Sequence, residues 1–159
     1  MPKMGAKLMI DQLDNKILSA LMNEAKTPYA DLARQFGVSP ATIHVRIEKL
    51  KSQGIIQGTH LTVDPKALGF DVVCFIGIKL NSASDYPDVL ERLKRIHAVT
   101  EAYYTTGQYS ILIKIMTRSI EDLQWLLIDQ IQSIESIQST ETLISLQNGI
   151  QRQISLFDH

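Results

Sequence analysis

The chain has 159 residues, 45% of them hydrophobic and 21% charged, which is typical of a soluble protein with one or two small domains. A single cysteine excludes an intrachain disulfide framework, and no segment resembles a membrane span or signal peptide, so the expected location is the cytoplasm. Residues 1–64 carry eight basic and six acidic side chains, whereas residues 65–159 carry eight and eleven, which favours a polyanionic partner for the first part.

The first part of the chain is predicted to be helical. Residues 1–9 are expected to be a disordered lead-in, and residues 10–56 to form a helix-turn-helix domain with winged-helix-like character. Apolar residues recur at helical spacing over residues 11–25 and again over residues 29–36, with a Thr-Pro break between them. Neither helix could bury its apolar stripe alone, so we expect both to pack with a third helix.

The third helix is predicted to begin at Pro40 and to follow a sharp turn at Gly37. Ser39 can accept a hydrogen bond from the amides of its first turn. The outer face begins with small and hydroxylated residues and continues with cations, the order that a helix in a DNA major groove needs. The candidate DNA contacts are therefore Ser39, Pro40, Ala41, Thr42, His44, Val45, Arg46, Lys49 and Lys51.

This helix leaves two interpretations open. An amphipathic surface helix with an ordinary solvated face would show the same apolar stripe. His44 is either a DNA contact or simply an exposed side chain. The histidines show no metal-ligand spacing, and neither a catalytic carboxylate pair nor a glycine-rich phosphate loop is present. We therefore expect no metal, no cofactor and no enzymatic site.

Residues 57–69 are predicted to link two domains, with an alternating strand over residues 57–64 and then a turn. Residues 70–159 read as βαββαβ, a ferredoxin-like domain with both helices on one face of one sheet, which makes the whole chain α+β. The expected strands are 70–80, 99–106, 110–116 and 137–147, and the expected helices are 85–96 and a long one from residue 119.

The first of these strands, FDVVCFIGIKL, is apolar on both faces, so we expect a central strand covered on both sides. The sheet face away from the helices has no covering element in the chain, which implies a partner, most simply a second copy. RNA-recognition domains share this fold, and Tyr103 and Tyr104 would suit base stacking. The negative charge of the second half argues against RNA.

Several motifs together resemble the Lrp/AsnC (feast/famine) family of bacterial and archaeal transcription regulators. They are LDNKIL, GVSPATIHVRIEKL followed by GIIQG, and TTGQYSILIKI within the βαββαβ domain, and the resemblance runs from about Ile10 to Leu156. The stretches VSPATIHVR, VTEAYYTTGQYSI and IQSTETLISLQN most resemble the asparagine-responsive members. The resemblance implies a sequence-specific regulator that binds double-stranded DNA, dimerises through its sheets and often assembles four dimers into an octamer. The alternative is an amino-acid-binding ferredoxin-like enzyme or regulatory subunit.

The resemblance also implies an effector site near the β-hairpin turn and the start of the last strand. A glycine turn exposes backbone N–H groups to a carboxylate, while a carboxylate side chain can receive an α-ammonium. The implied effector is a small amino acid, in the first place asparagine. Many members carry an acidic residue where Ser110 stands, and the alternative is a hairpin turn with exposed polar residues. The implied residues are Tyr104, Thr106, Gly107, Gln108, Tyr109, Ser110, Ser139, Thr140 and Glu141.

Overall fold

The computed structural model describes residues 10–156, and the predicted lead-in over residues 1–9 lies outside them. The chain divides into two compact units at Leu61, inside the predicted linker. Residues 150–156 group with the first unit, whereas Thr62–Gly149 form the second. No helix within residues 10–156 has the length and apolarity that crossing a membrane requires.

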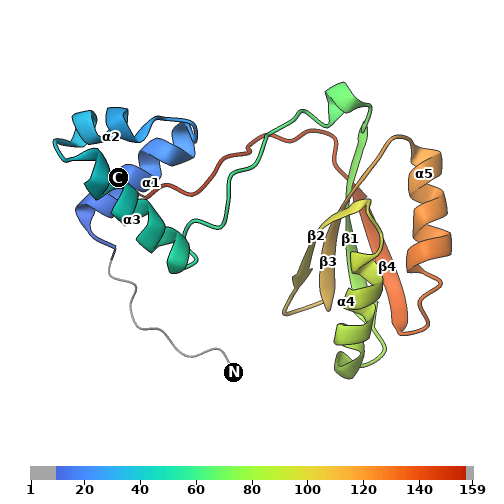
Figure 1. The fold of residues 1–159 in the computed structure, drawn as a ribbon. Coiled ribbons are helices and arrows are strands. Elements are labelled where there is room, and N and C mark those ends of the chain that lie inside the picture. The colour runs from blue at the N-terminus through green and yellow to red at the C-terminus, as the bar shows by residue number, and fades with distance from the viewer. Residues whose placement is uncertain (1–9, 157–159) are drawn as a thin grey trace. The chain divides into compact units, whose positions relative to one another are not determined.

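The first unit contains the predicted trihelical arrangement. Its helices are α1 (Gln12–Asn23), α2 (Tyr29–Phe36) and α3 (Pro40–Ser52), shown in blue to green in Figure 1. Their buried apolar side chains form one cluster, because each helix turns its stripe toward the other two. That cluster consists of Ile17, Leu32, Ala33, Ile43 and Ile47.

Local sequence signals set the ends of these helices, and the roles of Gly37, Ser39 and Pro40 are as predicted. Asp11 caps α1 and forms a reciprocal capping box with Asp14. Gly37 adopts the left-handed conformation (φ 68°) after α2, which favours glycine. Ser39 then caps α3, and Pro40 occupies the first turn of that helix.

The second unit is the predicted ferredoxin-like domain. Its sheet is antiparallel throughout, with the strand order β2-β3-β1-β4, and the helices cover one of its faces (Figure 1). Short 3₁₀ turns lie at Lys66–Leu68 and Ala83–Asp85, and α5 continues as a π-helical segment over Leu126–Ile131. The main elements are β1 (Val72–Leu80), α4 (Tyr86–Lys94), β2 (Val99–Tyr104), β3 (Ile111–Thr117), α5 (Ile120–Trp125) and β4 (Ile137–Ile144).

Two predictions about strands were wrong. No strand forms over residues 57–64, and the sheet takes no strand from that segment. Alternation of side chains cannot by itself supply the backbone partner that a strand needs. β1 is central, as expected, but within residues 10–156 only its helix-facing side is fully covered: Ile76 and Ile78 are buried, whereas Phe75 on the other side remains 36% exposed.

Candidate DNA-binding and effector-binding sites

The N-terminal half of α3 presents the small and hydroxylated face that the sequence predicted. The Ser39 hydroxyl accepts a hydrogen bond from the Thr42 backbone N–H at 3.1 Å and lies 2.9 Å from the Thr42 hydroxyl. Ala41 and His44 are exposed, and Val45 is 65% exposed. An exposed valine on a polar helix face suits contact with a thymine methyl group.

His44 has a neighbour that the sequence did not point to. Its ring lies 6.0 Å from the ring of Tyr29, the first residue of α2, in a tilted arrangement. The only sequence signal was an aromatic residue after the Thr-Pro break. Tyr29 therefore supports one side of the exposed helix face that begins at Ser39.

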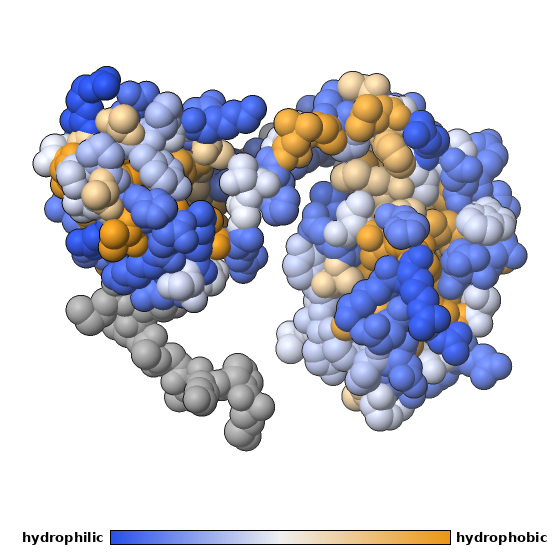
Figure 2. Space-filling view, in the orientation of Figure 1, coloured by the Kyte–Doolittle hydropathy of each residue, from blue (hydrophilic) through white to orange (hydrophobic). Residues whose placement is uncertain are grey.

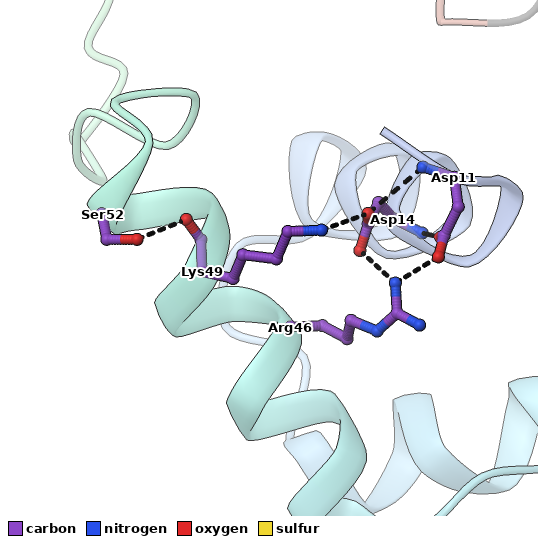
Figure 3. A network of polar contacts seen from close by, with 5 residues as sticks. All are labelled: Asp11, Asp14, Arg46, Lys49 and Ser52. Carbon is purple, nitrogen blue, oxygen red and sulfur yellow. Dashed lines mark hydrogen bonds and ion pairs between the residues drawn. The ribbon is translucent and has the colours of Figure 1, made fainter. Parts of the chain in front are cut away.

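Two of the predicted cations turn away from that face and toward α1 (Figure 3). Arg46 donates hydrogen bonds through Nη1 to Asp11 and, at 3.2 Å, to Asp14. Lys49 Nζ lies 3.7 Å from the other oxygen of Asp14. Lys51 instead forms an exposed ion pair with Glu48 one turn away, which adds little stability and exchanges readily.

The contacts of Asp11 predict an acid-sensitive helical unit. The backbone N–H of Asp14, and then the Arg46 guanidinium, hold the pKa of Asp11 below its usual range. Because the pKa of Asp11 is lower in the folded protein, its ionised carboxylate stabilises the fold. This contribution to the free energy of unfolding is complete above the ordinary pKa of about 3.9 and is lost as the pH falls through the lower folded value. The melting temperature of the first unit should therefore fall in this acid range. Asp11→Asn should flatten that dependence, and an unchanged pH profile in the variant would contradict it.

In the second unit, the hairpin between β2 and β3 folds back over the middle of β1. A Cβ built on Gly77 would lie 2.7 Å from the Tyr109 ring, so the ring rests directly on the glycine. Sequence analysis missed Gly77, although a glycine inside an apolar strand often marks a close approach. Gly107, at the turn, has a φ of 102°, as expected for a glycine-dependent hairpin.

Three of the predicted effector residues meet on the open face of the sheet. Gln108 Nε2 donates to the Tyr109 hydroxyl oxygen at 2.7 Å and to Glu141 at 3.5 Å. Glu141 pairs with Gly77 in the β1–β4 register, beneath the Tyr109 ring. Ser139 lies two residues along β4 and shares this face.

Other predicted effector residues lie elsewhere. Tyr104 packs on Tyr86 of α4, with ring centroids 4.3 Å apart, and the Thr140 hydroxyl accepts a hydrogen bond from Gln132 at 2.9 Å. Both therefore belong to the helix-covered side, because alternate strand residues point to opposite faces. Thr106 is exposed in the turn.

Ser110 has a structural part in the same hairpin. Its backbone N–H donates to the Ile78 carbonyl at 2.8 Å, and its hydroxyl accepts from the Leu80 backbone N–H at 3.3 Å. It thus ties the hairpin to β1. Among residues 10–156, no group of His, Cys, Asp or Glu side chains could hold a metal ion.

The open face of the sheet is also rich in exposed apolar side chains. Phe75 pairs with Leu143 across β1 and β4, and Leu143 is 55% exposed. Tyr103 is 53% exposed on β2, where its hydroxyl donates to Glu101, which also pairs with Lys114 at 3.1 Å. Elsewhere too, hydrophobic patches reach the surface of this unit among hydrophilic residues (Figure 2).

A helix-turn-helix unit joined to a ferredoxin-like unit with a polar cluster on its open face defines a DNA-binding regulator with a small-molecule domain. Residues 10–51 match the AsnC-type helix-turn-helix domain, and residues 73–154 match the Lrp/AsnC ligand binding domain. The chain belongs to the Lrp/AsnC family of transcriptional regulators. It is thus a DNA-binding transcriptional regulator with an amino-acid ligand-binding domain and not an enzyme.

Similarity to individual relatives extends over nearly the whole chain. The sequence is 63% identical over 146 residues to regulatory protein AsnC of Escherichia coli (strain K12), covering 92% of this chain and 96% of that protein. It is 57% identical over 145 residues to regulatory protein AsnC of Haemophilus influenzae, covering 91% and 97%. The solved structure of E. coli AsnC superposes with a TM-score of 0.90 at 62% identity, covering 92% of this chain and 99% of that one.

Proposed function

We propose that this regulator responds to asparagine, as regulators of asparagine synthesis would, and that the exposed face of α3 carries its sequence-specific DNA contacts. The observation that carries the effector proposal is the cluster of Gln108, Tyr109 and Glu141 above Gly77. These side chains offer an amide, a hydroxyl and a carboxylate within hydrogen-bonding reach of one another. The similarity to AsnC proteins points the same way.

The polar chemistry of this cluster suits a small zwitterion with an amide side chain. Glu141 can receive the α-ammonium, the turn at Gly107 can offer backbone N–H groups to the carboxylate, and Gln108 can pair with an amide. Leucine carries the same α-ammonium and α-carboxylate, but its side chain would leave the Gln108 amide unpaired, at a cost of about 1–3 kcal/mol once the bound ligand buries that amide. Aspartate would meet the charge of Glu141 and the net negative charge of residues 65–159.

Titration calorimetry with asparagine, aspartate, glutamine and leucine tests this order of affinity. We expect asparagine to bind more tightly than leucine or aspartate, and aspartate to be disfavoured further by its charge. Tightest binding of leucine or of aspartate would refute the proposal.

Gly77→Val tests where the effector binds. The backbone of Gly77 is ordinary strand, but the new side chain would displace the Tyr109 ring. We expect a loss of asparagine affinity of at least tenfold, or about 1.4 kcal/mol, with the sheet still folded. Gly149→Val is the matched control, because no atom lies within 4 Å of a Cβ at that position. Normal asparagine binding by Gly77→Val would place the site elsewhere.

The proposed DNA-facing residues are those of the predicted set whose side chains are not paired with Asp11 or Asp14 of α1. A Thr42→Ala or His44→Ala change should alter sequence preference, by about 1–3 kcal/mol for a good base contact. Lys51→Met should weaken binding to all sequences and lower the log–log salt slope by about one. Selection from a random duplex pool, followed by salt titration, measures both effects. If the variants match the unaltered protein in sequence preference and in salt slope, this face of α3 is not the DNA-binding surface. The proposed set is Ser39, Pro40, Ala41, Thr42, His44, Val45 and Lys51.

We further propose that the open sheet face is a dimer interface between two copies of the chain, and that four dimers form an octamer. Exposed Phe75, Tyr103 and Leu143 give this face the apolar character that a self-complementary interface needs. Because its partner is DNA, we place the protein in the cytoplasm. Light scattering tests the assembly, and a stable monomer at micromolar concentration would exclude it.

A further inference from the structure

The carboxylate of Asp14 is fully buried in the first turn of α1. A buried charge is tolerated only when it is paired and hydrogen-bonded, because water no longer solvates it. The Asp11 backbone N–H donates to Asp14 Oδ2 at 3.2 Å, which closes the capping box. The compensating positive charge comes from the other helix, through Arg46 Nη1 at 3.2 Å from Oδ1 and Lys49 Nζ at 3.7 Å from Oδ2.

Arg46 and Lys49 are three residues apart, so they project from the same side of α3. Figure 3 shows both side chains extending from α3 toward the beginning of α1. Arg46 Nη1 bridges the two acids of the capping box, Asp11 and Asp14. The same pair of carboxylates therefore caps α1 and holds α3.

This arrangement conflicts with a phosphate contact by Arg46. Its charge is already matched by two carboxylates, and its side chain is only 29% exposed. Turning the guanidinium toward DNA would remove the shortest ionic partner of the buried Asp14 carboxylate. The apolar contacts around Ile43 and Ile47 are non-directional, whereas the bridge fixes one rotation of α3 against α1.

We propose that Arg46, assisted by Lys49, is a positioning residue that acts through Asp14: it fixes α3 on α1 and so sets how Thr42 and His44 meet DNA, without neutralising a phosphate itself. This inference rests on the proposed DNA contacts of α3. On this helix, Lys51 is then the cation that pairs with a DNA phosphate.

The test compares the full chain with Arg46→Met, Asp14→Asn, the double variant and Lys51→Met. Affinity for a selected duplex and for an unrelated duplex is measured over a series of salt concentrations, together with thermal melting. Arg46→Met should lower the melting temperature and reduce affinity for the selected duplex about tenfold, leaving the salt slope unchanged. Lys51→Met should instead lower the slope by about one on both duplexes.

The double variant gives the sharpest distinction. Asp14→Asn removes the buried charge that Arg46→Met leaves paired with Lys49 alone, at 3.7 Å, so adding it should restore part of both the melting temperature and the affinity. A lost phosphate contact would not be restored in this way. If Arg46→Met does not fold, Arg46→Lys replaces it: a lysine cannot reproduce the bridge, so the same loss of affinity with an unchanged slope is expected.

The proposal is overturned if Arg46→Met lowers the salt slope by about one and leaves thermal melting unchanged. It is also overturned if the double variant binds no better than Arg46→Met. If the unaltered chain shows no salt-dependent binding to any duplex, the proposed DNA contacts of α3 fail instead.

Discussion

Phe75→Glu is expected to convert the proposed dimer into a monomer. Phe75 lies on the open face of the central strand, opposite Leu143, and is partly exposed in the single chain. Lys114, the neighbour of Phe75 on β3, already pairs with Glu101. In a two-fold assembly the substitution would therefore bury two added carboxylates, and the dimer dissociation constant should rise at least a hundredfold, or about 3 kcal/mol. Sedimentation or light scattering over a concentration series measures this change.

A matched control places the same charge on the other side of the domain. Ile120 is 50% exposed at the start of α5, so Ile120→Glu adds a carboxylate without touching the open face. We expect this variant to remain at least dimeric. An unchanged mass for Phe75→Glu would show that the open face is not the dimer interface.

Ile43→Ala is expected to destabilise the helical unit while the sheet unit still binds asparagine. Ile43 is fully buried among α1, α2 and α3, and removing its side chain leaves a cavity that costs about 2–5 kcal/mol. The sheet unit has a core of its own and should be spared. We therefore expect an earlier first transition in calorimetric melting, loss of DNA binding and unchanged asparagine affinity.

Val45→Ala is the control for this prediction, because Val45 is the neighbouring β-branched residue but is 65% exposed. Its melting profile should stay close to that of the unaltered protein. If Ile43→Ala also abolished asparagine binding, the two units would not be independent in stability.

The parts of the fold that follow from short-range signals could be predicted from the sequence. Ser39 and Pro40 mark the start of α3, and the apolar periodicity of residues 70–147 is sufficient for the ferredoxin-like order. The predicted strand over residues 57–64 failed because strand formation needs a partner, which the alternation of Leu61 and Val63 does not identify.

The candidate sites were predicted less completely. The alternation of side chains along β4 would have placed Thr140 and Glu141 on opposite faces of the sheet, because neighbouring strand residues point to opposite faces. The position of Arg46 on α3 indicated an outer flank, but not that Asp14 would lie within reach. That contact joins residues 32 positions apart, and helical periodicity holds no information about it.

The most direct test of the account is DNA binding by the full chain with and without asparagine. A duplex is first selected from a random pool, and its affinity is then measured by fluorescence anisotropy in saturating asparagine, in saturating leucine and in neither. We predict a salt-dependent, sequence-specific affinity that asparagine shifts and leucine does not. An affinity that is indifferent to asparagine, or that only leucine shifts, would contradict the account of an asparagine-responsive regulator.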